Sequence, residues 1–371
     1  MIGFMKTNEI LKKKKIVLLI DSIGPGGAQR QLVGLASFLK DKRYDVTVAI
    51  YHDIRFYENQ LIRANISLVY LEKAHNPLFR IWHISRYIRK LNPQTVISYL
   101  ETPSICACIA KLFNHRFKLI VSERNTTQQT GRNERIRFNL FRIADFIVPN
   151  AYSQEAYMRE KFPKLANKIV TIPNFVDLVY FVPPLERKRR EVPEIMIAAS
   201  IWPSKNTLGF IDTVSILKDR GCSFHVVWYG KSESNIEYYN KCHDKITQLG
   251  LEDYIMLKEK TSKIRDCYQK ADFFCLPSFY EGTPNVICEA MACGMPIICS
   301  DVCDNSRYVG DCVNGYLFDP HDALSMANAL ERMLSMKDMD YKAYCQNSRI
   351  RAEKLLSNDK FVKSYINLIE Q

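Results

Sequence analysis

Short apolar runs separated by amphipathic segments recur along the whole chain. Most runs have the length of one buried strand, and several of the segments between them have the apolar spacing of a helix packed on one face. The runs lie at residues 15–21, 45–51, 66–71, 94–99, 117–121, 146–149, 168–173, 195–200, 224–229, 254–258, 273–277 and 296–300. Strands that alternate with helices in this way predict an α/β fold with parallel sheets.

The length of the chain and a change in composition predict two domains. The 371 residues exceed the size of a typical single domain. Residues 179–191 contain two adjacent prolines and a run of basic residues, which is typical of a linker. We therefore expect a first domain at residues 1–180 and a second domain at residues 181–354.

A polar, glycine-bearing loop at residues 280–282 lies between an apolar run and a helical segment at 285–293. We expect Thr283 as the N-cap of that helix, Pro284 as its first residue and Gly294 as the glycine that ends it. In a parallel sheet, the loop and the helix N-terminus then lie at the carboxyl edge of the strands. Open α/β folds bind their ligands at this edge.

Two carboxylates flank this helix N-terminus. Glu281 lies in the loop, and Glu289 lies about two turns further along the helix. The backbone N–H groups present within residues 283–286 lack intrahelical acceptors and offer a site for an anion. Carboxylates repel a bare phosphate but bind hydroxyl groups, so the pattern favours a ligand with a central diphosphate and a sugar at each end. A nucleotide sugar has this structure.

E-G-T-P-N-V-I-C-E at residues 281–289 resembles the Glu-x₇-Glu motif of the retaining glycosyltransferases of family 4. E-A-M-A-C-G-M-P-I-I, which follows directly, and N-G-Y-L-F-D-P-H-D at 314–322 are also similar to this family. The resemblance implies a GT-B fold, in which two Rossmann-like, doubly wound domains face a cleft and a last helix, here about 355–371, crosses back to the first domain. It also implies that Glu281 contacts the transferred sugar and Glu289 holds the ribose. The alternative is two surface glutamates of an ordinary α/β domain.

The resemblance implies further donor contacts. In the family, an Arg and a Lys after the first strand of the second domain meet the diphosphate. Lys205 matches the Lys, but Ser200 stands at the Arg position, so Lys231 and Arg124 are candidates for the missing cation. The end of the strand at Lys258 matches the place where the family receives the base. The expected donor-binding residues are Gly26, Gly27, Lys205, Gly230, Lys258, Glu281, Gly282, Thr283, Pro284, Asn285, Val286 and Glu289.

Two segments of the first domain are placed near the cleft by the same resemblance. G-P-G-G at residues 24–27 lacks the spacing of a dinucleotide-binding loop. It is similar to the family's G-G-A-E segment, which lies close to donor phosphate and acceptor, but Gln29 replaces the Glu. S-E-R-N at 122–125 stands where many members have a histidine. Glu123 and Arg124 are either ligand-binding residues or an ordinary polar cluster at a strand end.

The basic charge is concentrated in the first half of the chain. Residues 1–180 carry 28 Lys+Arg and 14 Asp+Glu, a net charge of +14, whereas residues 181–371 carry 24 and 26, a net charge of −2. A basic domain suits anionic lipid, a phosphorylated acceptor or nucleic acid. Residues 130–146 predict either a basic amphipathic helix on a membrane or a core helix with a solvated basic face. The helix around Trp82 adds support for an anionic membrane surface, and nucleic acid is disfavoured because no recognition fold is readable.

Other classes of protein and site are disfavoured. No apolar run approaches the ~18–20 residues of a membrane-spanning helix, and the basic N-terminus is followed by too short an apolar run for a signal peptide. We expect a cytoplasmic protein that at most lies peripherally on the inner face of the plasma membrane. The twelve cysteines include no C-x-x-C pair and sit mostly in apolar runs, so neither disulfides nor zinc are expected. D-M-D at 338–340 is far from the donor loop and is not expected to bind a metal.

The sequence therefore predicts a metal-independent retaining hexosyltransferase without a cofactor. We expect it to move a sugar from a nucleoside-diphosphate sugar to a glycan or lipid-linked acceptor. By resemblance, the pathway is bacterial cell-surface polysaccharide synthesis, such as that of lipopolysaccharide, O-antigen or capsule. The expected catalytic residues are Lys205, Glu281, Arg124 and Glu123. The alternatives are a nucleotide-sugar epimerase of related fold, a non-catalytic donor-binding partner subunit, and a nicotinamide dehydrogenase, which the glycine spacing disfavours.

Overall fold

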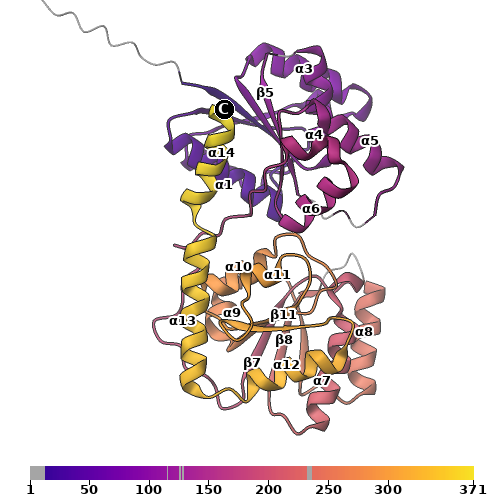
Figure 1. The fold of residues 1–371 in the computed structure, drawn as a ribbon, viewed down its shortest axis with the longest axis vertical. Helices are drawn as coiled ribbons and strands as arrows, with labels where there is room; N and C mark the ends of the chain where they lie inside the picture. Colours follow the sequence, from indigo (N-terminus) through magenta and orange to yellow (C-terminus); the bar gives the residue numbers. More distant parts are fainter. Residues whose placement is uncertain (1–12, 115, 125–126, 128, 232–235) are drawn as a thin grey trace, which may run out of the picture. The chain divides into compact units, whose positions relative to one another are not determined.

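The structure is a computed structural model that describes residues 13–114, 116–124, 127, 129–231 and 236–371. Most of the basic N-terminal segment and Asn125 of the S-E-R-N motif lie outside these residues. The chain divides into two compact units (Figure 1). The first unit contains the described part of Met1–Asn150, Glu155–Ile172 and Val362–Gln371, and the second contains Ala151–Gln154 and Pro173–Phe361.

A parallel sheet of six strands forms the centre of the first unit. Its order, β3-β2-β1-β4-β5-β6, is that of a doubly wound dinucleotide-binding sheet. Helices cover both faces of such a sheet, which explains why its strands read as continuous apolar runs. The strands are β1 (Lys15–Leu19), β2 (Asp45–Ile50), β3 (Ser67–Tyr70), β4 (Thr95–Tyr99), β5 (Lys118–Glu123) and β6 (Phe146–Pro149).

The helices of the first unit pack against this sheet, and α3 and α4 lie side by side (Figure 1). Burial raises the pKa of the core thiols Cys106 and Cys108 to about 11 and about 12, so both behave as small apolar groups. The helices are α1 (Gly27–Asp41), α2 (Glu58–Arg63), α3 (Pro77–Leu91), α4 (Glu101–Phe113), α5 (Arg132–Leu140), most of α6 (Tyr152–Lys161) and most of α14 (Asn358–Glu370).

The second unit repeats the same topology. Its parallel sheet has the order β12-β11-β10-β7-β8-β9, so the chain reverses direction across the sheet between β7 and β10. The strands are β7 (Glu194–Ala198), β8 (His225–Lys231), β9 (Ile255–Glu259), β10 (Phe273–Leu276), β11 (Ile297–Ser300) and β12 (Gly315–Phe318). The expected pair of doubly wound α/β domains is confirmed.

Seven helices of the described residues belong to the second unit, and α13 packs against α10 (Figure 1). They are α7 (Thr207–Asp219), α8 (Ile236–Gln248), α9 (Ile264–Lys270), α10 (Asn285–Ala292), α11 (Asn305–Tyr308), α12 (Ala323–Leu334) and α13 (Asp338–Leu355). In the part of the chain that the structure describes, no helix combines the length and the apolar character needed to cross a membrane.

Two expected elements differ in the structure. The strand predicted at 168–173 is wrong, because a 3₁₀ turn fills Pro163–Lys168 and only Ile169 forms an isolated bridge, to Ile147. The last helix, expected at about 355–371, is α14 and starts at Asn358, after a break at 356–357 that separates it from α13. The D-M-D segment forms the start of α13.

The expected linker at 179–191 contains no helix or strand, but its arginines are bound to other parts of the second unit. The Arg187 guanidinium donates to the carbonyl oxygens of Ala271, Tyr268 and Cys293, at 2.5, 2.9 and 3.0 Å. It thereby satisfies carbonyl groups at the ends of α9 and α10, where a positive charge also offsets the helix dipole. The boundary between the units falls after Ile172, earlier than the expected 180/181.

Candidate functional site

The loops that follow β7 and β10 form the candidate site of the second unit. These strands are hydrogen-bonded neighbours at the reversal of the strand order, so their carboxyl ends meet at one edge. The backbone N–H of Phe279 donates to the carbonyl of Ser204 at 2.9 Å and joins the two loops. The side chain of Asn206, which has a left-handed backbone, donates to the Pro320 carbonyl at 2.8 Å. The loop after β7 is therefore held on both sides.

Lys205 and Glu281 meet in this site. The Lys205 Nζ atom lies 2.5 Å from Glu281 Oε1, and the side chains are only 24% and 13% exposed. Lys205 ends a short 3₁₀ turn (Pro203–Lys205), and Glu281 lies in the loop before α10. The two opposite charges offset one another, so a phosphate oxygen that binds Lys205 competes directly with Glu281.

The N-terminus of α10 lies beside this ion pair in the sequence but begins later than expected. Helix α10 starts at Asn285, with Pro284 at the N-cap position and no side-chain cap. The predicted cap at Thr283 is therefore wrong, since that side chain hydrogen-bonds Tyr308. Asn174 donates to Asn285 Oδ1 at 2.8 Å and fixes the first residue of the helix. The first-turn N–H groups of α10, including that of Val286, have no intrahelical acceptor.

Gly282 and the buried Glu289 complete the set around α10. Gly282 continues the loop from Glu281, and Glu289 lies on the helix and is almost fully buried. The Tyr268 hydroxyl donates to Glu289 Oε2 at 3.2 Å, so α9 orients this carboxylate. Gly294 has a φ of +69° and ends the helix as predicted.

Gly230 and Lys258, two other expected donor-binding residues of this unit, have close neighbours within the unit itself. A Cβ atom at Gly230 would lie 1.7 Å from the carbonyl oxygen of Ala199, so only glycine allows β8 to approach the chain after β7. Lys258 is exposed, with its Nζ atom 5.7 Å from the centre of the Tyr229 ring. Lys231, a candidate for the missing cation, lies 4.8 Å from the centre of the Tyr239 ring.

The expected residues of the first unit lie at the carboxyl ends of β1 and β5. Gly26 is the N-cap residue of α1 and Gly27 is its first residue. A Cβ atom at Gly26 would lie 2.2 Å from Gln29 Oε1, so the glycine lets the Gln29 side chain fold back over the loop. Gln29 Nε2 lies 3.5 Å from Asp21 Oδ1. Gln29 therefore faces its own loop.

Arg124 is bound within the first unit. Its guanidinium donates to Ser122 Oγ at 2.7 Å, Tyr99 Oη at 2.9 Å and Tyr365 Oη at 2.6 Å, and it stacks on the Tyr99 ring. Burial alone lowers the pKa of Arg124, but the Tyr365 and Tyr99 hydroxyls outweigh it and leave the pKa raised. The group stays charged and ties β5 to the last helix, α14.

Glu123 is buried beside a second arginine. Arg137 of α5 is only 4% exposed, and its Nε atom lies 3.8 Å from Glu123 Oε2. The same guanidinium donates to Glu101 at 2.8 Å and to Thr127 at 2.9 Å. Within residues 130–146, α5 ends at Leu140 and buries Phe138 in the core. Arg132, Arg135 and Arg142 are exposed, as in a core helix with a solvated basic face, whereas Arg137 is turned inward.

Comparison with known proteins identifies the family. Residues 25–180 match the model of Glycosyltransferase Family 4, and residues 192–336 match the model of Glycosyl transferases group 1. The chain belongs to the family 4 glycosyltransferases, which have the GT-B fold. The resemblance of E-G-T-P-N-V-I-C-E to this family is thereby confirmed.

Relatives of this glycosyltransferase include bacterial enzymes with lipid-linked acceptors in their names. It is 27% identical to the Escherichia coli UDP-Gal:α-D-GlcNAc-diphosphoundecaprenol α-1,3-galactosyltransferase over 218 residues, 54% of this chain and 55% of that protein. It is 25% identical to a Campylobacter jejuni N-acetylgalactosamine-N,N′-diacetylbacillosaminyl-diphospho-undecaprenol 4-α-N-acetylgalactosaminyltransferase over 92% of this chain and 95% of that protein. The crystal structure of Anabaena Alr3699/HepE in complex with UDP and glucose superposes with a TM-score of 0.82 at 18% identity, over 96% and 99% of the two chains.

In this glycosyltransferase, Arg137, Glu101 and Tyr365 were not among the expected site residues. Glu101 comes two residues after the strand at 94–99, which was a usable signal for a residue at a strand end. Tyr365 carried no such signal, because its position beside Arg124 depends on how the last helix docks. Of the expected site residues of the second unit, Lys205 and Glu281 are in contact, and Gly282 follows Glu281 in the loop before α10.

Proposed function

We propose that this glycosyltransferase moves a hexose-type sugar from a nucleoside-diphosphate sugar to a lipid-linked glycan acceptor, with retention of the anomeric configuration. The observation that carries the proposal is the contact between Lys205 and Glu281 next to the N-terminus of α10, at the strand reversal of the second sheet. A cation, a carboxylate and unpaired amides within one loop pair suit a sugar diphosphate better than either a free sugar or a bare phosphate. The acceptor class is supported by the undecaprenol-linked substrates in the names of two relatives.

Each group has a separate task in the proposed reaction. The bond between the anomeric carbon and the donor phosphate oxygen breaks, and negative charge develops on the diphosphate. Lys205 and the amides of α10 stabilise that charge. Glu281 accepts hydrogen bonds from hydroxyl groups of the transferred sugar, and Glu289 accepts hydrogen bonds from those of the ribose. The acceptor hydroxyl attacks from the face that the phosphate leaves, and its proton passes to the departing phosphate oxygen, so no separate protein base is required.

We further propose that the first unit binds the acceptor and that the enzyme works on the cytoplasmic side of the plasma membrane. A lipid-linked acceptor is held in a bilayer, and the first half of the chain carries the whole excess of positive charge. Cell-surface polysaccharide synthesis is the pathway class that such an acceptor favours.

A binding and turnover experiment tests this proposal. We expect a nucleoside diphosphate to raise the melting temperature, by mass action, in a screen of nucleoside diphosphates and their sugars. The matching nucleotide sugar should donate its sugar to a short-chain polyprenyl-diphosphate sugar, and NMR of the product should show the anomeric configuration of the donor. Since Lys205 and the amides of α10 are assigned the charge stabilisation, transfer should persist in the presence of EDTA.

Other outcomes of the same experiment identify the alternatives. Binding of the nucleotide sugar without transfer to any acceptor would support a non-catalytic donor-binding subunit, for which the serine at position 200 is the supporting observation. Conversion of the donor sugar without an acceptor would indicate an epimerase. Inverted product, or loss of transfer in EDTA, would contradict the proposed mechanism.

A further inference from the structure

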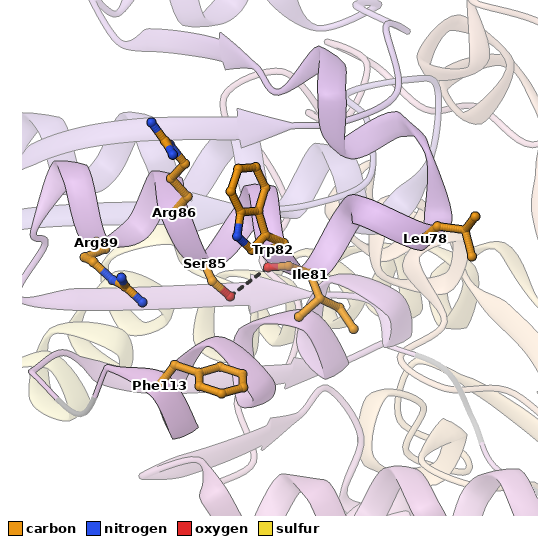
Figure 2. Close-up of a pocket in the computed structure, with 7 residues that line it drawn as sticks. All are labelled: Leu78, Ile81, Trp82, Ser85, Arg86, Arg89 and Phe113. Atoms are coloured by element: carbon orange, nitrogen blue, oxygen red, sulfur yellow. Dashed lines mark hydrogen bonds between the residues drawn. The ribbon is translucent and has the colours of Figure 1, made fainter.

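A groove of about 440 Å³ runs along α3 in the first unit, and the residues that line it are different from the expected site residues (Figure 2). Its walls are formed by Leu78, Ile81, Trp82, Arg86 and Arg89 of α3 and by Phe113 at the end of α4. Figure 2 shows Leu78 and Arg89 at opposite ends of this helical stretch, with Phe113 facing it from α4.

Large apolar side chains on this surface are unusually exposed. Leu78 is 86% exposed, Phe113 is 69% exposed and Trp82 is 55% exposed, and Phe79 is exposed next to them. Single exposed apolar residues are common on soluble proteins, but a contiguous group indicates a surface that binds something. The Ser85 hydroxyl donates to the Ile81 carbonyl at 2.7 Å within the helix, so its proton is not available to a ligand in the groove.

The charge of the surface is entirely positive. Residues 73–100 contain five Lys+Arg and no Asp or Glu. Arg80 is used internally, since it donates to the Ala74 and His75 carbonyls, but neither Arg86 nor Arg89 forms an ion pair within the described residues. The Arg86 guanidinium lies 5.4 Å from the centre of the Trp82 ring, so cation and aromatic ring share one face.

A comparison with α5 shows that a high arginine content alone does not produce this combination. Both helices are rich in arginine, but α5 buries Arg137 and Phe138, and its one large exposed apolar side chain is Ile136. Helix α5 therefore offers charge without an apolar surface. Helix α3 offers both, along 15 residues.

We infer that the α3 groove, together with Phe113, is a docking surface for an anionic phospholipid bilayer. A tryptophan with leucine and phenylalanine on one face, and arginines beside them, matches a helix that lies in the plane of the membrane interface. The arginines pair with lipid phosphates, while Trp82, Leu78 and Phe113 enter the boundary between head groups and acyl chains. A nucleic acid would use the arginines but leave the apolar residues in water. The inference deepens the proposed function, because a lipid-linked acceptor lies in such a bilayer, and it can be tested independently of transfer.

The test measures partition of the full chain onto vesicles of phosphatidylcholine alone and of phosphatidylcholine mixed with phosphatidylglycerol. We expect binding to the mixed vesicles and a blue shift of tryptophan emission that Trp82→Phe removes, since Trp228 is buried and the exposed Trp202 lies in the loop after β7 of the second unit, outside this surface. Replacing Arg86 and Arg89 together by Ala should weaken binding to mixed vesicles about 30-fold. The matched control replaces Arg132 and Arg135 of α5 by Ala, which removes the same charge and should change binding about threefold or less.

The outcomes separate this inference from the proposed function. Transfer to a short-chain soluble acceptor should be unchanged in the α3 variants, whereas transfer to a vesicle-bound acceptor should fall with binding. Vesicle binding with no transfer at all would refute the proposed function and leave the docking surface standing. Equal loss of binding in the α3 and α5 variants, or no vesicle binding by the native chain, would overturn the inference. A change from dimer to monomer on replacing Trp82 and Phe113 by Ser would show instead that two copies pair through this surface.

Discussion

The carboxyl edges of the two sheets have the same topology but use their charged residues differently. At the first edge, Arg124 and Arg137 are bound by hydroxyl and carboxylate groups of their own unit. At the second edge, Lys205 is held by one partner, Glu281, and both side chains remain partly exposed. A charged residue at a strand end is thus no proof of a ligand site. The number and burial of its internal partners distinguish a structural cation from one that can bind substrate.

The largest expected effect is on the stability of the first unit. Replacing Arg137 by Leu leaves Glu123 as a buried carboxylate without its nearby arginine, and should lower the free energy of unfolding by about 3–5 kcal/mol. Urea denaturation, analysed with a separate transition for each unit, measures this change. Arg135 is exposed on the same helix, so Arg135→Leu should change the value by less than about 0.5 kcal/mol. Equal stability of the two variants would mean that the first edge does not depend on its buried arginine.

At the second edge, the expected effect is on rate and not on stability. Replacing Lys205 by Met should lower kcat about 100- to 1000-fold with a small change in donor KM, because the ammonium acts on charge that develops in the transition state. Steady-state kinetics with saturating acceptor measure both constants. Lys241→Met, on the exposed side of α8, is the matched control. A lowered melting temperature together with a nearly unchanged kcat would make Lys205 a structural cation like Arg124.

The smallest expected effect concerns the group behind Glu289. Tyr268→Phe removes a hydroxyl that donates to this carboxylate and should weaken donor binding about three- to tenfold, with kcat nearly unchanged. Isothermal titration with the donor nucleotide measures the affinity. Combining Glu289→Gln with Tyr268→Phe should not restore donor affinity, because the Tyr268 hydroxyl acts only through the Glu289 carboxylate. Unchanged donor affinity of Tyr268→Phe would show that Tyr268 contributes only to the packing of the core.

The sequence predicted the second edge better than the first for a physical reason. Residues 273–300 form strand, loop, helix and strand in one continuous segment, so local patterns determine the position of Glu281. The burial of Arg137 instead depends on Glu101 and Glu123, which come from two other elements, α4 and β5. A basic helix read alone gives no sign of those partners.

Smaller errors have equally local causes. The run at 168–173 has strand composition, but it meets the sheet only at its edge and forms one bridge. Thr283 has a side chain that suits an N-cap. In the structure Pro284 takes the N-cap position, α10 starts at Asn285, and the Thr283 side chain hydrogen-bonds Tyr308 instead. Helix α4 begins at Glu101 and includes Pro103 in its first turn, where proline costs no hydrogen bond.

The contribution of Val362–Gln371 to the first unit has a consequence for biosynthesis. The hydroxyl of Tyr365 completes the surroundings of Arg124 and Tyr99, yet it is translated after the whole of the second unit. On the ribosome, the amino-terminal half therefore emerges with a cation whose final partner has not been made. Its folding is completed only after the second unit has been synthesised, so the order of synthesis and the order of maturation of the two halves are not the same.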